Sequence, residues 1–138
     1  AVEARRHRVT VEVDAATRLE ADAGKLHDIL RNLLENAVHY SPEEADIHIE
    51  GACDHGVCRI VVSDPGPGIP PQDLTRVFER FYRVDRSRSQ PGTGLGLAIV
   101  RHLVELHGGE VRVANRPEGG AVFTVTLPQR QGKAVTQN

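Results

Sequence analysis

Residues 26–40 read LHDILRNLLENAVHY and carry two patterns along one predicted helix. The first is apolar and follows the i, i+3, i+4, i+7 spacing of a buried helix face, with Leu26, Ile29, Leu30, Leu33, Leu34 and Ala37 as its members. Asp22 is the predicted N-cap, and Ser41 before Pro42 predicts that the helix ends near Tyr40. The helix therefore presents one face to a core and leaves another face free for polar contacts.

The second pattern is polar and consists of Asn32, Asn36 and His39, with Asp28 one turn earlier. Asparagine is a mediocre helix former, so two asparagines one turn apart need an explanation. A solvated helix face is one interpretation. The other is a metal site, because an asparagine carbonyl oxygen is a hard ligand suited to Mg²⁺ that is shared with substrate phosphates.

Strand patterns surround this helix. Residues 8–13 alternate polar and apolar and predict a half-buried outer strand, residues 47–50 and 59–62 predict a hairpin around 54–56, and residues 111–113 and 123–127 predict a terminal hairpin. A second amphipathic helix begins near Leu95 and ends at Gly108-Gly109. Interleaved helices and hairpins predict an α/β two-layer sandwich, with a mixed, mostly antiparallel sheet covered on one face by helices.

Length and composition limit the class of protein. The 138 residues suffice for one domain, which we assign to residues 1–128, with residues 129–138 as a frayed tail. Seventeen basic against nineteen acidic residues give a formal charge of -2, which disfavours a nucleic-acid partner, and no stretch is long enough to cross a membrane. Cys53 and Cys58 are too few for a disulfide framework or a structural zinc site, so a reducing, cytoplasmic setting is favoured.

Two glycine-rich segments carry further chemistry. Residues 64–71, DPGPGIPP, predict an ordered loop in which a carboxylate and bare backbone can hold a planar nucleobase, although a plain turn is the alternative. Residues 92–97, GTGLGL, lead into the second helix, where backbone N–H groups favour an anion, with a flexible hinge as the alternative. Between them we expect a short helix over residues 73–81 and a long arginine-rich loop over residues 83–93.

The order of these motifs resembles the catalytic ATP-binding domain of bacterial sensor histidine kinases, in the wider group that includes gyrase, the large ATP-dependent chaperones and the mismatch-repair ATPases. The resemblance extends from about Val9 to Pro128 and implies the Bergerat-type ATP-binding fold. Residues 32–42 are similar to the asparagine box of that family, residues 62–70 to its first glycine box, residues 78–83 to its phenylalanine box and residues 92–100 to its second glycine box.

This resemblance implies roles for individual residues. Asn36 and Asn32 are expected to hold Mg²⁺ against the phosphates of ATP, and Asp64 to accept a hydrogen bond from the adenine amine. Asn32 and Arg83 are the expected catalytic residues, and residues 84–91 the ATP lid. The other expected nucleotide contacts are His39, Tyr40, Gly66, Gly68, Ile69, Tyr82, Thr93, Gly94, Leu95, Gly96, Leu97 and Thr124. His39 replaces a frequent lysine of the family, and Pro65 a frequent asparagine.

The residue type at position 32 also distinguishes ATP hydrolysis from phosphoryl transfer within the group. Gyrase-like ATPases carry a glutamate at this position to activate water, and an amide cannot take that proton. The expected activity is therefore that of an ATP-dependent protein-histidine kinase of a two-component system, with slow hydrolysis of ATP. The alternatives are a nucleotide-binding regulatory module without phosphotransfer and a gyrase-like ATPase.

The remaining expectations concern partners. None of the seven histidines has the sequence context of the usual phosphoacceptor, so we expect the acceptor on a dimerisation domain absent from this chain. The fragment is then a monomer that does not autophosphorylate alone and does not contact the membrane itself. A response regulator is expected downstream, and the parent protein is compatible with an anchor in the inner membrane.

Overall fold

The computed structural model describes residues 8–13, 21–41, 44–80, 82 and 96–129. Its sheet has five strands in the order β1-β2-β3-β5-β4. Strands β1 (Arg8–Val13) and β2 (Asp46–Asp54) are parallel. Strand β3 (Val57–Ser63) is antiparallel to both of its neighbours, β2 and β5 (Ala121–Pro128). Strand β4 (Glu110–Asn115) is antiparallel to β5. The predicted mixed, mostly antiparallel sheet is thereby confirmed.

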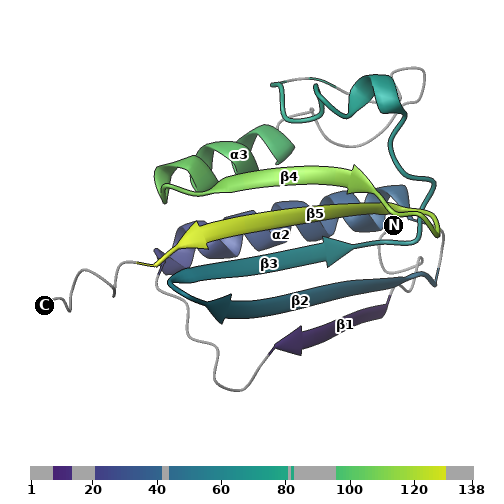
Figure 1. Ribbon diagram of the computed structural model, residues 1–138. Coiled ribbons are helices and arrows are strands. Elements are labelled where there is room, and N and C mark those ends of the chain that lie inside the picture. The colour runs from purple at the N-terminus through teal and green to yellow at the C-terminus, as the bar shows by residue number, and fades with distance from the viewer. Residues whose placement is uncertain (1–7, 14–20, 42–43, 81, 83–95, 130–138) are drawn as a thin grey trace, which may run out of the picture.

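The helices α2 (Ala23–Tyr40) and α3 (Gly96–Leu106) lie on the same side of this sheet, so the molecule has two layers (Figure 1). The core contains the apolar stripe of α2, two valines of α3, two residues of the segment after η1 and inward-facing residues of the strands. These residues are Ile29, Leu33, Ala37, Val100, Val104, Val77, Phe78, Ile47, Ile60, Val62, Ala121, Phe123, Val125 and Leu127. The predicted two-layer sandwich is confirmed, because the buried face of α2 is the one that its apolar spacing indicates.

The ends of α2 also follow the prediction. The Asp22 side chain accepts a hydrogen bond from the Lys25 N–H at 2.9 Å, and this bond is the main reason that the pKa of Asp22 is lowered. At the other end the Ser41 N–H donates to the Ala37 carbonyl at 3.0 Å. Ser41 itself is extended, with φ −95° and ψ 154°, so the helix ends at Tyr40, as the sequence predicts.

Strand β1 differs from the prediction, because all six of its residues are exposed although we expected a half-buried strand. It lies at the edge of the sheet and pairs only with β2, beyond the strands that α2 and α3 cover (Figure 1). Val9, Val11 and Val13 are consequently 47–58% exposed. Alternation predicts which residues share a face but not whether a helix covers that face.

The predicted helix over residues 73–81 is wrong as well. The structure has a 3-10 helix, η1 (Pro71–Asp73), followed by turns with i→i+3 bonds from Arg76 N–H to Asp73, from Glu79 N–H to Arg76 and from Tyr82 N–H to Glu79. Short segments adopt such tighter turns because an isolated α-helical turn is costly to nucleate.

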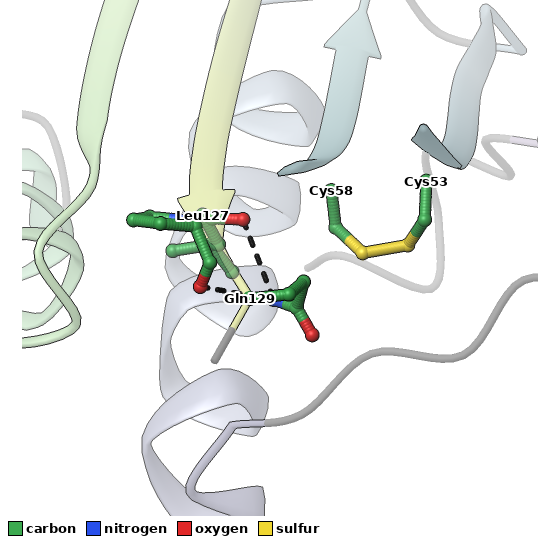
Figure 2. Close-up of a disulfide and its surroundings, with 5 residues drawn as sticks. Cys53, Cys58, Leu127 and Gln129 are labelled. Atoms are coloured by element: carbon green, nitrogen blue, oxygen red, sulfur yellow. Dashed lines mark hydrogen bonds between the residues drawn. A yellow bond between two sulfur atoms is a disulfide. The ribbon is translucent and has the colours of Figure 1, made fainter. Parts of the chain in front are cut away.

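The two cysteines form a disulfide that sequence analysis did not predict, so the cysteine count no longer supports a reducing setting. Cys53 and Cys58 are opposite each other in the β2–β3 register and close the hairpin, next to Gln129 at the end of β5 (Figure 2). The turn between them places His55 at φ 54° and Gly56 at φ 79°, as a two-residue hairpin requires. None of the helices in the described ranges is long and apolar enough to cross a membrane.

Candidate nucleotide site

Segments that are distant in sequence meet at the end of the sheet where β3 finishes. The last turns of α2, the loop after β3, the β4–β5 turn and the start of α3 all lie at this end (Figure 1). Residues 64–70, which we call the Asp64 loop, connect β3 to η1. The predicted nucleobase loop and the predicted metal-binding helix are therefore on neighbouring elements.

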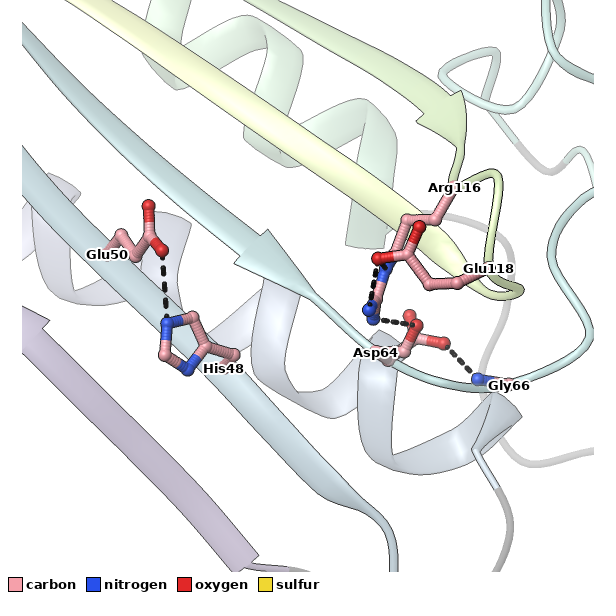
Figure 3. Close-up of polar contacts among 6 residues, drawn as sticks. All are labelled: His48, Glu50, Asp64, Gly66, Arg116 and Glu118. Carbon is pink, nitrogen blue, oxygen red and sulfur yellow. Dashed lines mark hydrogen bonds and ion pairs between the residues drawn. The ribbon is translucent and has the colours of Figure 1, made fainter.

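Asp64 is the buried carboxylate of this region, with 4% of its surface exposed. Its Oδ1 accepts a hydrogen bond from the Gly66 N–H at 2.8 Å, and its own N–H donates to the Ala121 carbonyl at 3.1 Å (Figure 3). The side chain is thus oriented by the backbone of its own loop, while β5 fixes its main chain.

The pKa of Asp64 is raised, mainly because burial disfavours the charged form. Backbone N–H groups of Gly66 and Ala121, the Ser41 hydroxyl and the positive charge of Arg116 act in the opposite direction. A buried carboxylate that still has polar neighbours is suited to accept a further hydrogen bond from a planar ligand with an amine.

Residues at the end of β4 and in the β4–β5 turn form hydrogen bonds with the Asp64 loop. The Asn115 side chain bonds both the N–H and the carbonyl of Ile69, each at 2.7 Å. Arg116 Nη1 donates to the Asp64 carbonyl at 3.2 Å, while its Nη2 pairs with Glu118 at 2.8 Å (Figure 3). These contacts attach both ends of the loop to the end of β4 and the residue that follows it.

Asn32 of α2 faces the start of α3. Asn32 Nδ2 donates to the Asp28 carbonyl at 2.8 Å, and a Cβ added to Gly96 would be 3.1 Å from Asn32 Oδ1. Asn36 and His39 are half-buried on the following turns of the helix. The amide oxygen of Asn32 therefore points to the helix end at which the glycine-rich segment was predicted to bind phosphate.

Tyr82 is held by its own segment. Its hydroxyl donates to the Asp73 carboxylate, and the Arg76 guanidinium lies 4.6 Å from the centroid of its ring. Gly96 and Leu97 form the first turn of α3, and Leu97 packs against the core. The predicted contacts of Arg83, Thr93, Gly94 and Leu95, the predicted lid, and the side chain of Tyr40 lie outside the described residues.

The predicted nucleotide contact of Thr124 does not agree with the structure. It is in the middle of β5, paired with Val61 and Arg112, between Phe123 and Val125, which face the core. Its side chain is therefore on the sheet face opposite the helices, and the structure does not bring it to Asp64. The β5 residue next to Asp64 is Ala121, at the start of the strand.

Sequence analysis also missed the supporting residues Asn115, Arg116 and Gly120. They belong to the turn of the predicted terminal hairpin, where polar residues and glycine are ordinary. Their partners are about fifty positions earlier in the chain, as the separation of 52 between Arg116 and Asp64 illustrates. No local pattern reports a contact over that separation.

Comparison with known proteins gives one family for most of the chain. Residues 21–131 match the family model described as "Histidine kinase-, DNA gyrase B-, and HSP90-like ATPase". This range contains every segment that meets at the end of the sheet where β3 finishes.

Individual relatives agree with that match. The chain is 42% identical to the sensor-like histidine kinase SenX3 of Mycolicibacterium smegmatis over 125 residues, which are 88% of this chain and 33% of SenX3. The structure is similar to that of the mycobacterial sensor histidine kinase MprB, with a TM-score of 0.80 and 38% identity, covering 92% of this chain and 88% of that one. It is also similar to full-length ShkA in complex with AMPPNP, with a TM-score of 0.78 and 32% identity, covering 92% of this chain and 26% of ShkA. The chain spans 33% or less of the length of the curated relatives that it matches.

Proposed function

The chain belongs to the family of histidine kinase-, DNA gyrase B- and HSP90-like ATPases, and we propose that its site binds Mg²⁺-ATP for phosphoryl transfer to a protein histidine. The relatives that support this assignment are sensor histidine kinases. The observation that carries the proposal is the buried Asp64 carboxylate, held by the Gly66 N–H at the end of the sheet. A nucleotide with an exocyclic amine is the ligand that this acceptor suits.

In this proposal Asp64 accepts a hydrogen bond from the adenine amine, and the backbone around Gly66 and Gly68 lies against the ring. The positive φ of 82° at Gly68 shapes the loop for that contact. Ile69 is half-buried against the core and forms one wall of the pocket. Burial of Asp64 strengthens the bond, because a hydrogen bond to a charged group is worth more where water is excluded.

Asn36 and Asn32 fit the role of magnesium ligands. The Asn32 amide has its NH₂ group occupied by the Asp28 carbonyl, so its oxygen is the atom presented toward Gly96. Carbonyl oxygens are the ligands that Mg²⁺ takes, and Mg²⁺ when bound neutralises phosphate charge. Phosphate oxygens are then expected next to the N-terminus of α3, with Thr93, Gly94, Leu95 and Gly96 around them.

Phosphoryl transfer requires a nucleophile from outside this site. An imidazole nitrogen of the acceptor histidine attacks the γ-phosphorus, the bond to the β–γ bridging oxygen breaks, and ADP leaves. Asn32 has no basic group that would activate water, so the γ-phosphoryl is retained for the protein acceptor. Arg83 is proposed to stabilise the transferred group, and the acceptor to lie on the kinase's own dimerisation domain.

The same reasoning gives the cellular context. A response regulator receives the phosphoryl group from the histidine, as in two-component signalling. The domain acts in the cytoplasm, because that compartment supplies ATP and the response regulator. Neither nucleic acid nor a membrane is needed for the reaction that this site is proposed to perform.

Calorimetric titration with a non-hydrolysable ATP analogue tests the binding part. We expect binding that Mg²⁺ strengthens and that Asp64→Asn weakens at least about tenfold, because an amide places an NH₂ group among donors. The control is Asp54→Asn, since Asp54 is 81% exposed in the β2–β3 turn. Absence of binding, or equal binding by both variants, contradicts the proposal.

Addition of a histidine-kinase dimerisation domain tests the transfer part. Acid-labile phosphate on that domain is expected from labelled ATP. A regulatory module that binds ATP without transfer, which Pro65 and His39 favour as departures from the family pattern, would leave the acceptor unlabelled. Rapid release of free phosphate without an acceptor would instead indicate a gyrase-like ATPase.

A further inference from the structure

One side chain at the end of β4 makes two hydrogen bonds to the Asp64 loop. Asn115 is the last residue of β4, and Ile69 is 46 positions earlier. Asn115 Nδ2 donates to the Ile69 carbonyl, and the Ile69 N–H donates to Asn115 Oδ1, both at 2.7 Å. A carboxamide is the chemical group that can do both at once, because it carries a donor and an acceptor in one plane.

The loop held by this contact has few backbone donors of its own. Pro65, Pro67 and Pro70 have no N–H, and the Gly66 N–H is already bonded to Asp64. The Ile69 N–H is therefore one of the few groups by which the loop can be attached to the rest of the domain, and Asn115 occupies it. Without Asn115 the C-terminal half of the loop loses both bonds to β4.

Gly68 fits against the same side chain. It has φ 82°, and a Cβ at this position would be 2.8 Å from Asn115 Oδ1. The loop backbone thus approaches Asn115 more closely than any other residue type would allow. Loop conformation and the Asn115 rotamer are mutually dependent.

We propose that Asn115 is a positioning residue for adenine: by clamping the Ile69 backbone it sets the loop that carries Asp64 and Gly68. This inference rests on the proposed function, because it assumes that Asp64 and Gly68 contact the base. The Asn115 side chain is exposed and makes both of its loop contacts with main-chain atoms of Ile69, so its role is to set the loop geometry and not to bind the nucleotide itself.

The variants Asn115→Ala and Asn115→Asp test the clamp. Alanine removes both bonds, and aspartate keeps the size but replaces the donor with an oxygen that repels the Ile69 carbonyl. The matched control is Arg112→Ala on the same strand, which removes only an exposed ion pair with Glu110. Thermal unfolding identifies any variant that fails to fold.

Two measurements are made on each variant. In titrations with the non-hydrolysable ATP analogue, both Asn115 variants should raise Kd about tenfold, as expected for the loss of two hydrogen bonds. The ratio of Kd without Mg²⁺ to Kd with Mg²⁺ should stay at the wild-type value, because the magnesium ligands on α2 are untouched. In hydrogen exchange without nucleotide, the Ile69 amide should exchange slowly in wild type and in Arg112→Ala, and faster in both Asn115 variants.

Other results overturn the proposal. An unchanged Kd in a variant whose Ile69 amide exchanges faster would show that the clamp does not position adenine. A lost magnesium ratio would show that Asn115 acts on the site as a whole. If wild type binds no ATP analogue, the proposed function fails and the positioning role with it, while slow exchange of Ile69 would still report a structural clamp.

Discussion

A Cβ on Gly120 would overlap the main-chain carbonyl of Asp64, so the β4–β5 turn and the Asp64 loop are in direct backbone contact. Gly120 has φ 96°, which favours glycine independently of that contact. The preceding Gly119 has φ 111°, but nothing lies within 4 Å of a Cβ added there. Alanine at Gly119 would introduce backbone strain alone, whereas alanine at Gly120 would introduce both strain and steric overlap. Comparing the two substitutions therefore distinguishes the two effects on stability.

Gly120→Ala should therefore lower the free energy of unfolding by about 3 kcal/mol, and Gly119→Ala by only about 1 kcal/mol. Urea unfolding monitored by circular dichroism measures both. The Gly120 variant should also bind the ATP analogue more weakly, because Asp64 must move to make room. Equal losses of stability in the two variants would mean that the turn moves away from Asp64 at little cost.

The fold was largely predictable because its elements carry strong local signals. The apolar spacing from Leu26 to Ala37, the Asp22 cap and the turn at 54–56 each depend on neighbours within one or two turns. The exposure of β1 was not predictable, since it depends on which strands α2 covers. The disulfide depends on the register that places Cys53 opposite Cys58, which two cysteines five positions apart do not reveal.

The candidate site was predictable where motif residues lie next to each other in sequence. Asp64 and Gly66 form their bond within one loop, and the spacing of Asn32 and Asn36 follows from the helix. Asn115 and Gly120 could not be found, because their roles consist of contacts with residues about fifty positions away. Thr124 was misplaced for a different reason: the family resemblance suggested an adenine contact, whereas the local alternation of β5 already sends Thr124 to the face away from the helices.

Reduction of the disulfide should affect stability and not binding. The Cys53–Cys58 bond closes a short loop, so the chain-entropy model predicts a loss of about 2 kcal/mol on its removal. The β2–β3 turn precedes β3, and Asp64 follows the other end of that strand, so the two lie at opposite ends of the sheet. Urea unfolding of the double variant Cys53→Ser/Cys58→Ser, and of the wild type with reductant, measures this loss. A change in Kd for the ATP analogue beyond twofold would contradict the separation of hairpin and site.

As pH falls, titration of Asp64 should raise the free energy of unfolding and lower the affinity for the nucleotide. Because the pKa of Asp64 is raised, the folded chain binds this proton more tightly than the unfolded chain does. The contribution of Asp64 to the free energy of unfolding therefore increases as pH falls through its folded pKa toward the ordinary aspartate value. In the proposed site the ionised carboxylate accepts from the adenine amine, so affinity should decrease over the same range.

The difference between wild type and Asp64→Asn isolates this effect, since the asparagine does not titrate. Urea unfolding and calorimetry between about pH 4 and 7 cover the range from the ordinary aspartate pKa upward. Parallel pH curves for the two proteins, in stability or in affinity, would show that Asp64 does not titrate as its burial implies.

Asn36 should carry the magnesium dependence of binding. It is half-buried on α2, one turn after Asn32, whose amide oxygen faces the start of α3. Asn36→Ala removes one oxygen ligand but no adenine contact, so it should abolish most of the affinity that Mg²⁺ adds and leave Mg²⁺-free affinity within about twofold of wild type. Glu35→Ala is the matched control, because Glu35 precedes Asn36 on the same helix and is exposed. Calorimetry with and without Mg²⁺ on wild type and both variants measures the six affinities that this comparison needs. If Glu35→Ala loses the magnesium enhancement and Asn36→Ala keeps it, the metal is bound from a different face of α2 than the asparagine spacing predicts.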